Sequence, residues 1–444
     1  SDPRTGEIIK GHVSLGSLRI RQDFLIAQAL QAPYANDDTS DEFALEMALA
    51  RIRQLSAHEV GHTIGLAHNF AASTKGRSSV MDYPHPTLSL KDKKVDFTNA
   101  YDTKIGDWDK VAIAYSYGEY AGDEDASLNK LLDDAFKNGA RFITDQDARP
   151  QGSAHAYAHL WDNGVNVSIE LDNLLTLRKH AIANFSIDNI KTNQPYSVLE
   201  DVFVPLYFFH RYQTEGVTKV IGGLDYNYAL KGDGSNIVKM VPGKTEKKAL
   251  ASILKTLNIE ELAIPKKLLN LFPPRAFNYG RTRESFKSKT GVAFDPFGAV
   301  ETASAMTLEL LLHPERVTRL VQHKSLDDSQ LGLVEVLDEV IANSIQKTYK
   351  DAYYQELQNV VNYQVLNQLF HLSSNKDMYW QVNAIVNDKI DKISLFLKNS
   401  KETGIQKMYH KEMIQMISNF KKNPIKFKKP QTPKIPDGSP IGSD

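Results

Sequence analysis

The chain has 444 residues, of which 41% are hydrophobic and 24% charged, as in ordinary soluble globular proteins. Lysine and arginine number 53 and aspartate and glutamate 54, so the formal net charge of −1 gives no global reason to expect nucleic acid or an anionic membrane as a partner. Cysteine is absent, which excludes disulfides and thiolate ligands, and no stretch approaches the ~20 apolar residues of a membrane helix.

The first forty residues predict one short strand and one helix. We expect a short strand around residues 12–15 and a helix over about residues 18–30, which Pro33 and the Asn36-Asp37-Asp38 cluster end. The chain starts at Ser1, without an initiating methionine and without the basic and apolar regions of a signal peptide. We therefore expect a fragment or a processed product of a longer protein.

A strong helix signal follows. Thr39 is suited to cap the N-terminus, while Glu42, three residues later, closes a capping box. Apolar residues then recur at helical spacing from Phe43 to Leu55. These signals together predict a helix over about residues 39–64.

The end of this helix carries the sequence His58-Glu59-Val60-Gly61-His62-Thr63-Ile64-Gly65-Leu66-Ala67-His68. Residues four apart share one face of a helix, so His58 and His62 are expected to present imidazole nitrogens to one point. Glu59 is one step round from His58, where its carboxylate reaches water at a bound metal without being a ligand itself. This is the placement that a general base requires.

The third histidine requires a turn. If the helix continued, His68 would lie ~15 Å from His58 along the axis, whereas zinc requires each nitrogen at ~2.0–2.1 Å. Gly65 stands where the chain must reverse, and glycine adopts a positive φ there without a steric penalty. The spacing therefore predicts a zinc site with His58, His62 and His68 as ligands and Gly65 as the hinge.

The segment Ser79-Val80-Met81-Asp82-Tyr83-Pro84 follows the third histidine. Together with the zinc motif, it resembles the metzincin clan of zinc metalloproteases, in which a methionine turn lies beneath the metal. The resemblance implies that Met81 forms a hydrophobic floor under the three imidazoles. It also implies that Tyr83 reaches the zinc or the developing oxyanion, as the equivalent tyrosine does in astacin-like and serralysin-like enzymes. A purely structural role for the Tyr83 hydroxyl stays open.

Two further segments extend this resemblance. Residues 2–7, Asp-Pro-Arg-Thr-Gly-Glu, match a strand that precedes the zinc helix in a group of large secreted bacterial zinc-dependent metalloproteases, and residues 105–118 resemble the helix that closes the lower half of metzincin catalytic domains. That group implies an extracytoplasmic location and a long helical C-terminal region. The chain departs from the best-known metzincins at Asn69, where several families have an acidic residue or serine. Only 57 residues precede His58, so we expect part of the upstream strands to be missing.

Beyond residue 118 the chain changes character, because long amphipathic segments dominate. One hairpin is expected, over residues 225–230 and 237–241, across Gly232-Asp233-Gly234. The expected helices cover residues 107–117, 125–137, 167–183, 197–214, 246–257, 299–311, 331–370 and 380–398.

These elements predict an α+β, mostly helical fold. We expect a metzincin-like catalytic domain over residues 1–120, with its zinc helix over about 39–64 and its Met-turn over 79–84. A mainly α-helical C-terminal domain is expected over residues 121–425. Residues 426–444 are rich in lysine and proline and are expected to form a disordered tail.

Two other groups of residues carry weaker signals. His155 and His159 are four apart, but no third ligand or acidic base is spaced to match them, so we interpret them as incidental rather than as a second metal site. The acidic clusters at residues 144–147 and 161–164 lack the periodicity of a calcium loop. Turn and cap roles are the main interpretation for these clusters, with calcium binding as the alternative.

The motifs together predict a zinc-dependent endopeptidase that acts on protein or peptide substrates, with Glu59 as the general base. Two alternatives stay open at this point. The first alternative is a catalytically silent binding module that retains zinc. The second is a zinc hydrolase that acts on a non-peptide bond. The sequence predicts neither the oligomeric state nor the subsite preference of the protein.

Overall fold

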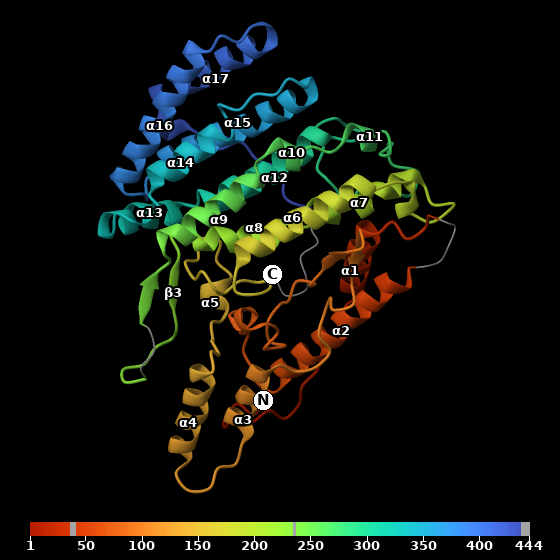
Figure 1. Cartoon of the computed structure of the whole chain (residues 1–444), viewed down its shortest axis with the longest axis vertical. Helices are drawn as coiled ribbons and strands as arrows, with labels where there is room; N and C mark the ends of the chain where they lie inside the picture. Colours follow the sequence, from red (N-terminus) through yellow and green to blue (C-terminus); the bar gives the residue numbers. More distant parts are fainter. Residues whose placement is uncertain (36–40, 234–236, 437–444) are drawn as a thin grey trace.

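Helices predominate in the computed structural model, which describes residues 1–35, 41–233 and 237–436 (Figure 1). Within these residues, strands are confined to two small antiparallel hairpins. The expected α+β, mostly helical fold class is therefore confirmed.

The N-terminal part is built on two helices, α1 (Ser17–Leu30) and α2 (Glu42–Thr63), which pack against each other (Figure 1). Helix α2 is the helix that the sequence predicts over residues 39–64. Its N-cap is Asp41, and Thr39 of the expected capping box lies outside the described residues. The strand expected around residues 12–15 does not form. These residues are exposed, and no described strand lies beside them to complete their backbone hydrogen bonds.

A long loop follows α2 and contains residues 79–84 and a small hairpin of β1 (Ser89–Lys91) and β2 (Lys94–Asp96). Helices α3 (Asp107–Tyr117) and α4 (Glu124–Lys137) then form an arm at one end of the molecule (Figure 1). Both helices agree with the sequence prediction, and the expected residues 107–117 are those of α3.

The rest of the chain packs around one large hydrophobic core. In Figure 1 its helices lie in successive layers, from α6 and α8 next to the N-terminal part to α16 and α17 farthest from it. These helices are α6 (Val167–Asn184), α7 (Leu199–Tyr207), α8 (Arg211–Val220), α9 (Gly243–Lys255), α12 (Pro296–Leu311), α13 (Pro314–Leu326), α14 (Leu333–Ala342), α15 (Ala352–Ser374), α16 (Trp380–Asn399) and α17 (Gly404–Lys422).

Two segments that the sequence predicts as single helices are each divided into two. The helix expected over residues 197–214 corresponds to the pair of α7 and the start of α8, and the helix expected over residues 331–370 corresponds to the pair of α14 and most of α15. Both members of each pair bury an apolar face in the same core, so hydrophobic spacing continues across the breaks. The start of α15 is marked by the Asp351 carboxylate, which accepts a hydrogen bond from the Tyr354 backbone N–H at 3.1 Å.

The expected hairpin is confirmed, with shorter strands than the sequence suggests. Strands β3 (Leu224–Tyr226) and β4 (Val238–Met240) pair antiparallel, with Tyr226 opposite Val238. Gly234 of the expected turn lies outside the described residues.

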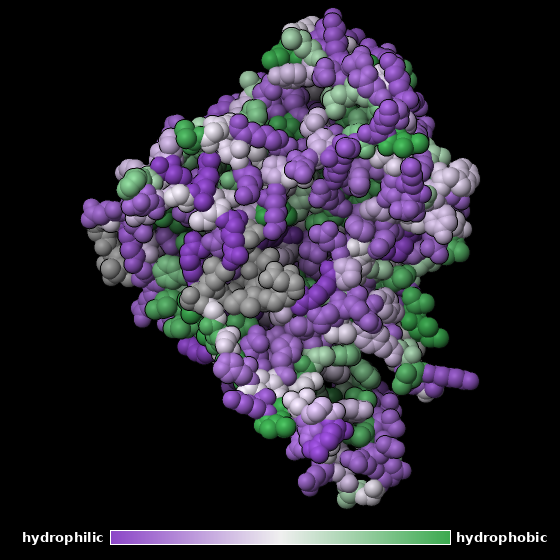
Figure 2. Space-filling model, turned by 180° about the vertical axis from the view of Figure 1, so that it is seen from behind, coloured by the Kyte–Doolittle hydropathy of each residue, from purple (hydrophilic) through white to green (hydrophobic). Residues whose placement is uncertain are grey.

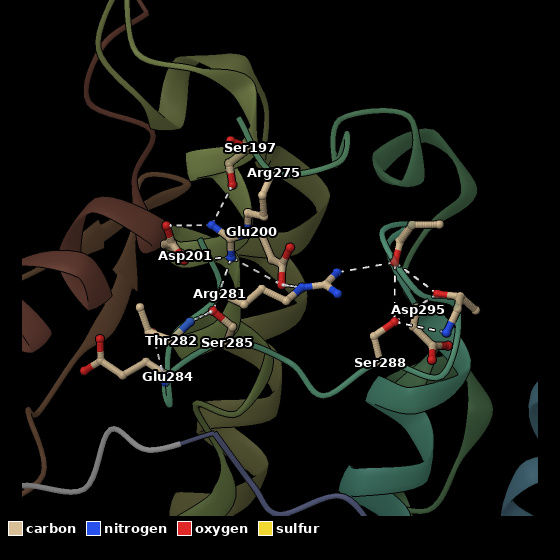
Figure 3. Close-up of polar contacts among 12 residues, drawn as sticks. Ser197, Glu200, Asp201, Arg275, Arg281, Thr282, Glu284, Ser285, Ser288 and Asp295 are labelled. Carbon is tan, nitrogen blue, oxygen red and sulfur yellow. Dashed lines mark hydrogen bonds and ion pairs between the residues drawn. The ribbon is translucent and has the colours of Figure 1, made fainter. Parts of the chain in front are cut away.

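Segments on the two sides of residue 120 pack against each other, since α1 contacts α6 and α7. Figure 3 shows how the loop before α12 is anchored to α7: the two Nη atoms of Arg275 donate to the two carboxylate oxygens of Asp201, at 2.9 Å each. Glu284 of the same loop accepts a hydrogen bond from Gln22 of α1 at 3.1 Å. The contacts of α1 with α6 and α7 and of Gln22 with Glu284 cross the domain boundary expected near residue 120, which stays a prediction.

The tail expected to be disordered over residues 426–444 is in contact with the helical part as far as it is described. The Lys429 ammonium donates to Glu309 at 2.7 Å, and the Arg211 guanidinium donates to the Pro436 carbonyl at 3.1 Å. These hydrogen bonds, which composition alone does not reveal, hold the tail up to residue 436. The remaining residues lie outside the described part of the chain.

Polar side chains cover most of the face shown in Figure 2, and hydrophobic side chains appear there as smaller separate patches. In the described part of the chain, every helix is too short or too polar to span a membrane.

Candidate metal centre

Helix α2 places the first two predicted ligands on one face. The Nε2 atoms of His58 and His62 lie 3.0 Å apart, as the spacing of four residues in a helix allows. His58 is buried, and His62 is partly buried near the end of the helix. The pair therefore forms a ligand site at the C-terminal end of α2.

A glycine turn brings the third histidine back to this site. Gly65 has a φ of +85°, its N–H donates to the His62 carbonyl at 3.0 Å, and the Leu66 N–H donates to the Gly61 carbonyl at 3.0 Å. This pair of bonds is the Schellman motif, which ends a helix with a left-handed residue. The chain then reverses, and the Nε2 atom of His68 lies 3.1 Å from that of His62. The predicted hinge at Gly65 agrees with this geometry.

The second nitrogen of each histidine is held by an oxygen atom. The Nδ1 atoms of His58 and His62 lie 2.6 Å from the Val80 carbonyl and 2.9 Å from the Leu66 carbonyl. Carbonyl oxygens only accept hydrogen bonds, so each Nδ1 carries the proton and each Nε2 keeps a free lone pair. Neutral imidazoles in this tautomer are the form that binds metal.

The third histidine is held by a carboxylate instead. The Nδ1 atom of His68 lies 2.9 Å from Oδ2 of Asp145. Burial raises the pKa of Asp145, but hydrogen bonds from Arg149 and His68 outweigh burial and lower it to about 2, so this carboxylate is ionised at neutral pH. His68 therefore has the same tautomer as the other two histidines.

The three histidines fit a metal ion well. Their candidate ligand atoms all lie within 4.8 Å of one another. A tetrahedral zinc ion at ~2.0–2.1 Å from each nitrogen would separate the nitrogens by about 3.3 Å. The Nε2 atom of His62 lies 3.0 Å from that of His58 and 3.1 Å from that of His68, which is close to this separation. Three lone pairs that face one another repel without a cation between them. Burial also lowers the pKa of His58 to about 3 and lowers that of His68, which favours the neutral form of both rings.

Met81 lies against the helix that carries the ligands. Its side chain is 1% exposed, and a Cβ atom built on Gly61 would collide with the Met81 sulfur. The methionine therefore packs on α2 between the first two histidines, where the sequence predicts a hydrophobic floor.

The loop that carries Met81 is fixed by Asp109 of α3. Asp109 accepts hydrogen bonds from the Ser79 hydroxyl at 2.6 Å, the Val80 N–H at 2.9 Å and the Gly106 N–H at 2.6 Å. The same carboxylate thus caps α3 and holds the Met-turn.

Tyr83 lies beside the histidines. Its ring centroid is 5.1 Å from that of His58 and 5.0 Å from that of His68, and its opposite face stacks on Trp161 at 4.8 Å. Its hydroxyl oxygen is 3.3 Å from Nη2 of Arg149, which donates to it. Burial raises the pKa of Tyr83, so the phenol keeps its proton at neutral pH.

Glu59 is partly buried on α2, directly after the first histidine. After burial, the negative charge of Glu59 is one of the causes that raise the pKa of Tyr83, so the two side chains lie near each other. Glu59 and Tyr83 therefore lie in the region of the three histidines, and their catalytic roles stay a prediction.

Asp145 and Arg149 belong to the site, and sequence reasoning missed both roles. Asp145 opens the short helix α5 (Asp145–Ala148), and the Arg149 guanidinium pairs with it. The Arg149 charge also lies 5.5 Å from the centre of the Tyr83 ring. Residues 144–147 are visible in the sequence as an acidic cluster, but their distance from the zinc motif along the chain hides their contact with His68.

His155 and His159, the second histidine pair, form hydrogen bonds with backbone carbonyls. His155 Nε2 lies 2.8 Å from the Tyr226 carbonyl, and His159 Nε2 lies 2.8 Å from the Tyr212 carbonyl. The two rings thus bind different backbone segments. Among the described residues, the group of three or more histidines and carboxylates close enough to share one metal ion is the one formed by the three predicted ligands.

Comparison with known proteins adds one assignment. No curated protein and no solved structure matches the chain significantly. A family model described as Met-zincin matches residues 40–352, more than half of the chain, and this match includes the three histidines, the Met-turn and Asp145. The chain belongs to the Met-zincin family.

Proposed function

We propose that this chain is a zinc-dependent endopeptidase. Membership of the Met-zincin family supports a zinc metallopeptidase in general. The observation that carries the proposal is the convergence of three Nε2 lone pairs at one point, with Glu59 directly after the first of the three histidines.

The metal supplies one part of the chemistry. A zinc ion held by His58, His62 and His68 supplies a Lewis acid, which lowers the pKa of water and stabilises negative charge on a carbonyl oxygen. The protein orients the three imidazoles through hydrogen bonds to Val80, Leu66 and Asp145.

Glu59 acts as the general base and then as the general acid. Its carboxylate takes a proton from the attacking water and delivers it to the amine that leaves when the peptide bond breaks. The Tyr83 hydroxyl accepts a hydrogen bond from Arg149 and keeps its own proton to donate to the carbonyl oxygen as negative charge develops there.

The test is cleavage of an unfolded protein by the zinc-loaded chain, compared with Glu59→Gln. We expect the variant to bind one zinc per chain and to lose activity by at least ~100-fold, because it lacks the base. Glu46→Gln, at an exposed position of the same helix, is the matched control and should retain both properties. Internal cleavage sites in the products would identify an endopeptidase.

Other results would select the alternatives. Comparable cleavage by Glu59→Gln would rule out Glu59 as the base. One bound zinc without cleavage of any peptide would favour a silent binding module, and a parallel panel of ester and non-peptide amide substrates would detect a hydrolase of another class.

A further inference from the structure

Asp82 of the Met-turn and Asp162 carry two buried carboxylates. Asp82 is 5% exposed and Asp162 is 3% exposed, and burial together with the charge of Asp162 raises the pKa of Asp82. A β-bridge between Pro84 and Asp162 brings their segments together. Among the described residues, neither carboxylate forms an ion pair. The nearest cation that acts on Asp162 is the buried ammonium of Lys219, which is shared with Glu215.

A cavity of about 20 Å³ lies between these groups, large enough for one small ion or water molecule. Gln54 and Ser73 line it together with the two aspartates. Oδ1 of Asp162 and Oε1 of Gln54 are buried without a hydrogen-bond partner. The Gln54 amide nitrogen donates to the Val80 carbonyl at 3.1 Å, which fixes the orientation of the amide and leaves its oxygen unpaired.

The unpaired oxygens of Asp162 and Gln54 and the carboxylate of Asp82 are hydrogen-bond acceptors, and the Ser73 hydroxyl, which lowers the pKa of Asp162, is a donor among the four residues. Buried carboxylates and unpaired buried oxygens cost free energy unless something compensates them. Asp82 already accepts hydrogen bonds from the Ser73 N–H at 3.0 Å and the Tyr83 N–H at 2.7 Å, which favours its ionised form. Burial raises the pKa of both carboxyls, to about 7 for Asp162, so a cation in the cavity would replace protons that these groups otherwise retain.

Two positive groups also line the cavity. Arg77 forms an ion pair with Asp102 at 3.0 Å and donates to the Ala100 carbonyl at 2.7 Å, and Lys104 is the second. The carboxylate, amide and hydroxyl oxygens of Asp82, Asp162, Gln54 and Ser73 suit a hard cation, and calcium takes such ligands at ~2.3–2.6 Å.

We propose that this cavity is a calcium site formed by Asp82, Asp162, Gln54 and Ser73, separate from the histidine site. Calcium there would tie the Met-turn to the segment that carries Trp161, whose ring stacks on Tyr83. The site stabilises the floor of the metal centre and takes no part in the chemistry. The inference does not depend on peptidase activity.

Terbium luminescence tests the site directly, because Tyr83 and Trp161 each adjoin a proposed ligand and transfer excitation to bound Tb³⁺. Zinc-loaded chain is titrated with Tb³⁺, and Ca²⁺ is then added as a competitor. We expect saturable emission that Ca²⁺ displaces, and a loss of Tb³⁺ affinity of at least about tenfold in Asp162→Asn. Asp134→Asn, which removes an exposed carboxylate on α4, should bind like the parent chain.

Thermal unfolding provides the second measurement, since Asp162→Asn removes charge repulsion and is expected to fold. Ca²⁺ should raise the Tm of the parent chain and leave that of Asp162→Asn unchanged. If the carboxyl groups instead share a proton, Asp162→Asn would be more stable, Ca²⁺ would have no effect on either protein and no sensitised emission would appear. That result, or an equal Ca²⁺ response in both proteins, would overturn the proposal.

Discussion

The Nδ1 atom of His68 lies 2.9 Å from Oδ2 of Asp145, a residue 77 positions further along the chain. Arg149 pairs with the same carboxylate and donates to the Tyr83 hydroxyl at 3.3 Å. The short segment at residues 145–149 therefore contacts both a predicted metal ligand and the tyrosine beside it. The metal centre depends on a segment well beyond the zinc motif and the Met-turn.

Substitution of Asp145 should weaken zinc binding. Asp145→Asn keeps an acceptor but loses the charge, and Asp145→Ala loses both, so we expect zinc affinity to fall by ~10–100-fold, most in the alanine variant. Competition with a chromophoric chelator measures this affinity. Asp134→Asn breaks a comparable pair with Lys130 on α4 and is the control. An equal loss in the control would show that Asp145 acts only through general stability.

Removal of the chain after residue 140 should abolish zinc binding. The shortened chain lacks the Ile143 carbonyl, which accepts from the Phe70 N–H at 2.8 Å, and also lacks Asp145 and the Trp161 ring. We expect no stoichiometric zinc by metal analysis and no cooperative unfolding transition. A chain ending at residue 423, which lacks only the docked tail, should retain zinc. A folded, zinc-binding fragment of residues 1–140 would instead support an independent catalytic domain.

The zinc ligands are predictable from sequence because they are local. Three ligands and a hinge glycine within residues 58–68 define the helix, the turn and the metal geometry together, and the structure has the same arrangement. Spacing alone is not enough, however. His155 and His159 are also four apart, but their segment is not helical, so the two rings reach different backbone carbonyls.

Long-range contacts explain what the sequence does not predict. Asp145 has no periodic relationship to His68, and Asp82 and Asp162 are visible only as residues in separate turns until a β-bridge joins their segments. The sequence does not show the breaks between helices in the core for a different reason. Because α7 and α8 both have buried residues, apolar side chains continue across the break between the two helices.

Gly65→Ala should disturb both stability and zinc binding. An alanine at φ +85° costs about 1–2 kcal/mol, and relief of that strain would move His68. Gly139→Ala is a matched control, since Gly139 has the same φ of +85° with open space around it after α4. Chemical denaturation should show similar destabilisation in both variants, while zinc affinity falls in Gly65→Ala alone. Unchanged zinc affinity in that variant would contradict the hinge role of Gly65.

Tyr83→Phe should lower kcat and leave zinc affinity nearly unchanged. The variant keeps the ring that stacks on Trp161 but lacks the hydroxyl proposed to donate to the carbonyl oxygen, so we expect kcat to fall by ~100–1000-fold. Tyr228→Phe removes a hydroxyl that donates to Asp147 at 2.6 Å and provides the control. If kcat is unchanged, the Tyr83 hydroxyl has only a structural role in its contact with Arg149.

Buried His210 should make the free energy of unfolding depend on pH. Burial, reinforced by the charges of Arg178 and Arg211, holds its pKa well below 6.5, so the folded state keeps it neutral while the unfolded state takes up a proton. Its contribution to stability is therefore complete above about pH 6.5 and is lost as the pH falls, by at most about 1.4 kcal/mol per pH unit. Urea denaturation between pH 7.5 and 4.5 should give a smaller pH slope for His210→Gln than for the parent chain. His12→Gln, at an exposed position, is the control and should keep the pH slope of the parent chain. If His210→Gln also had the slope of the parent chain, His210 would be protonated in the folded state.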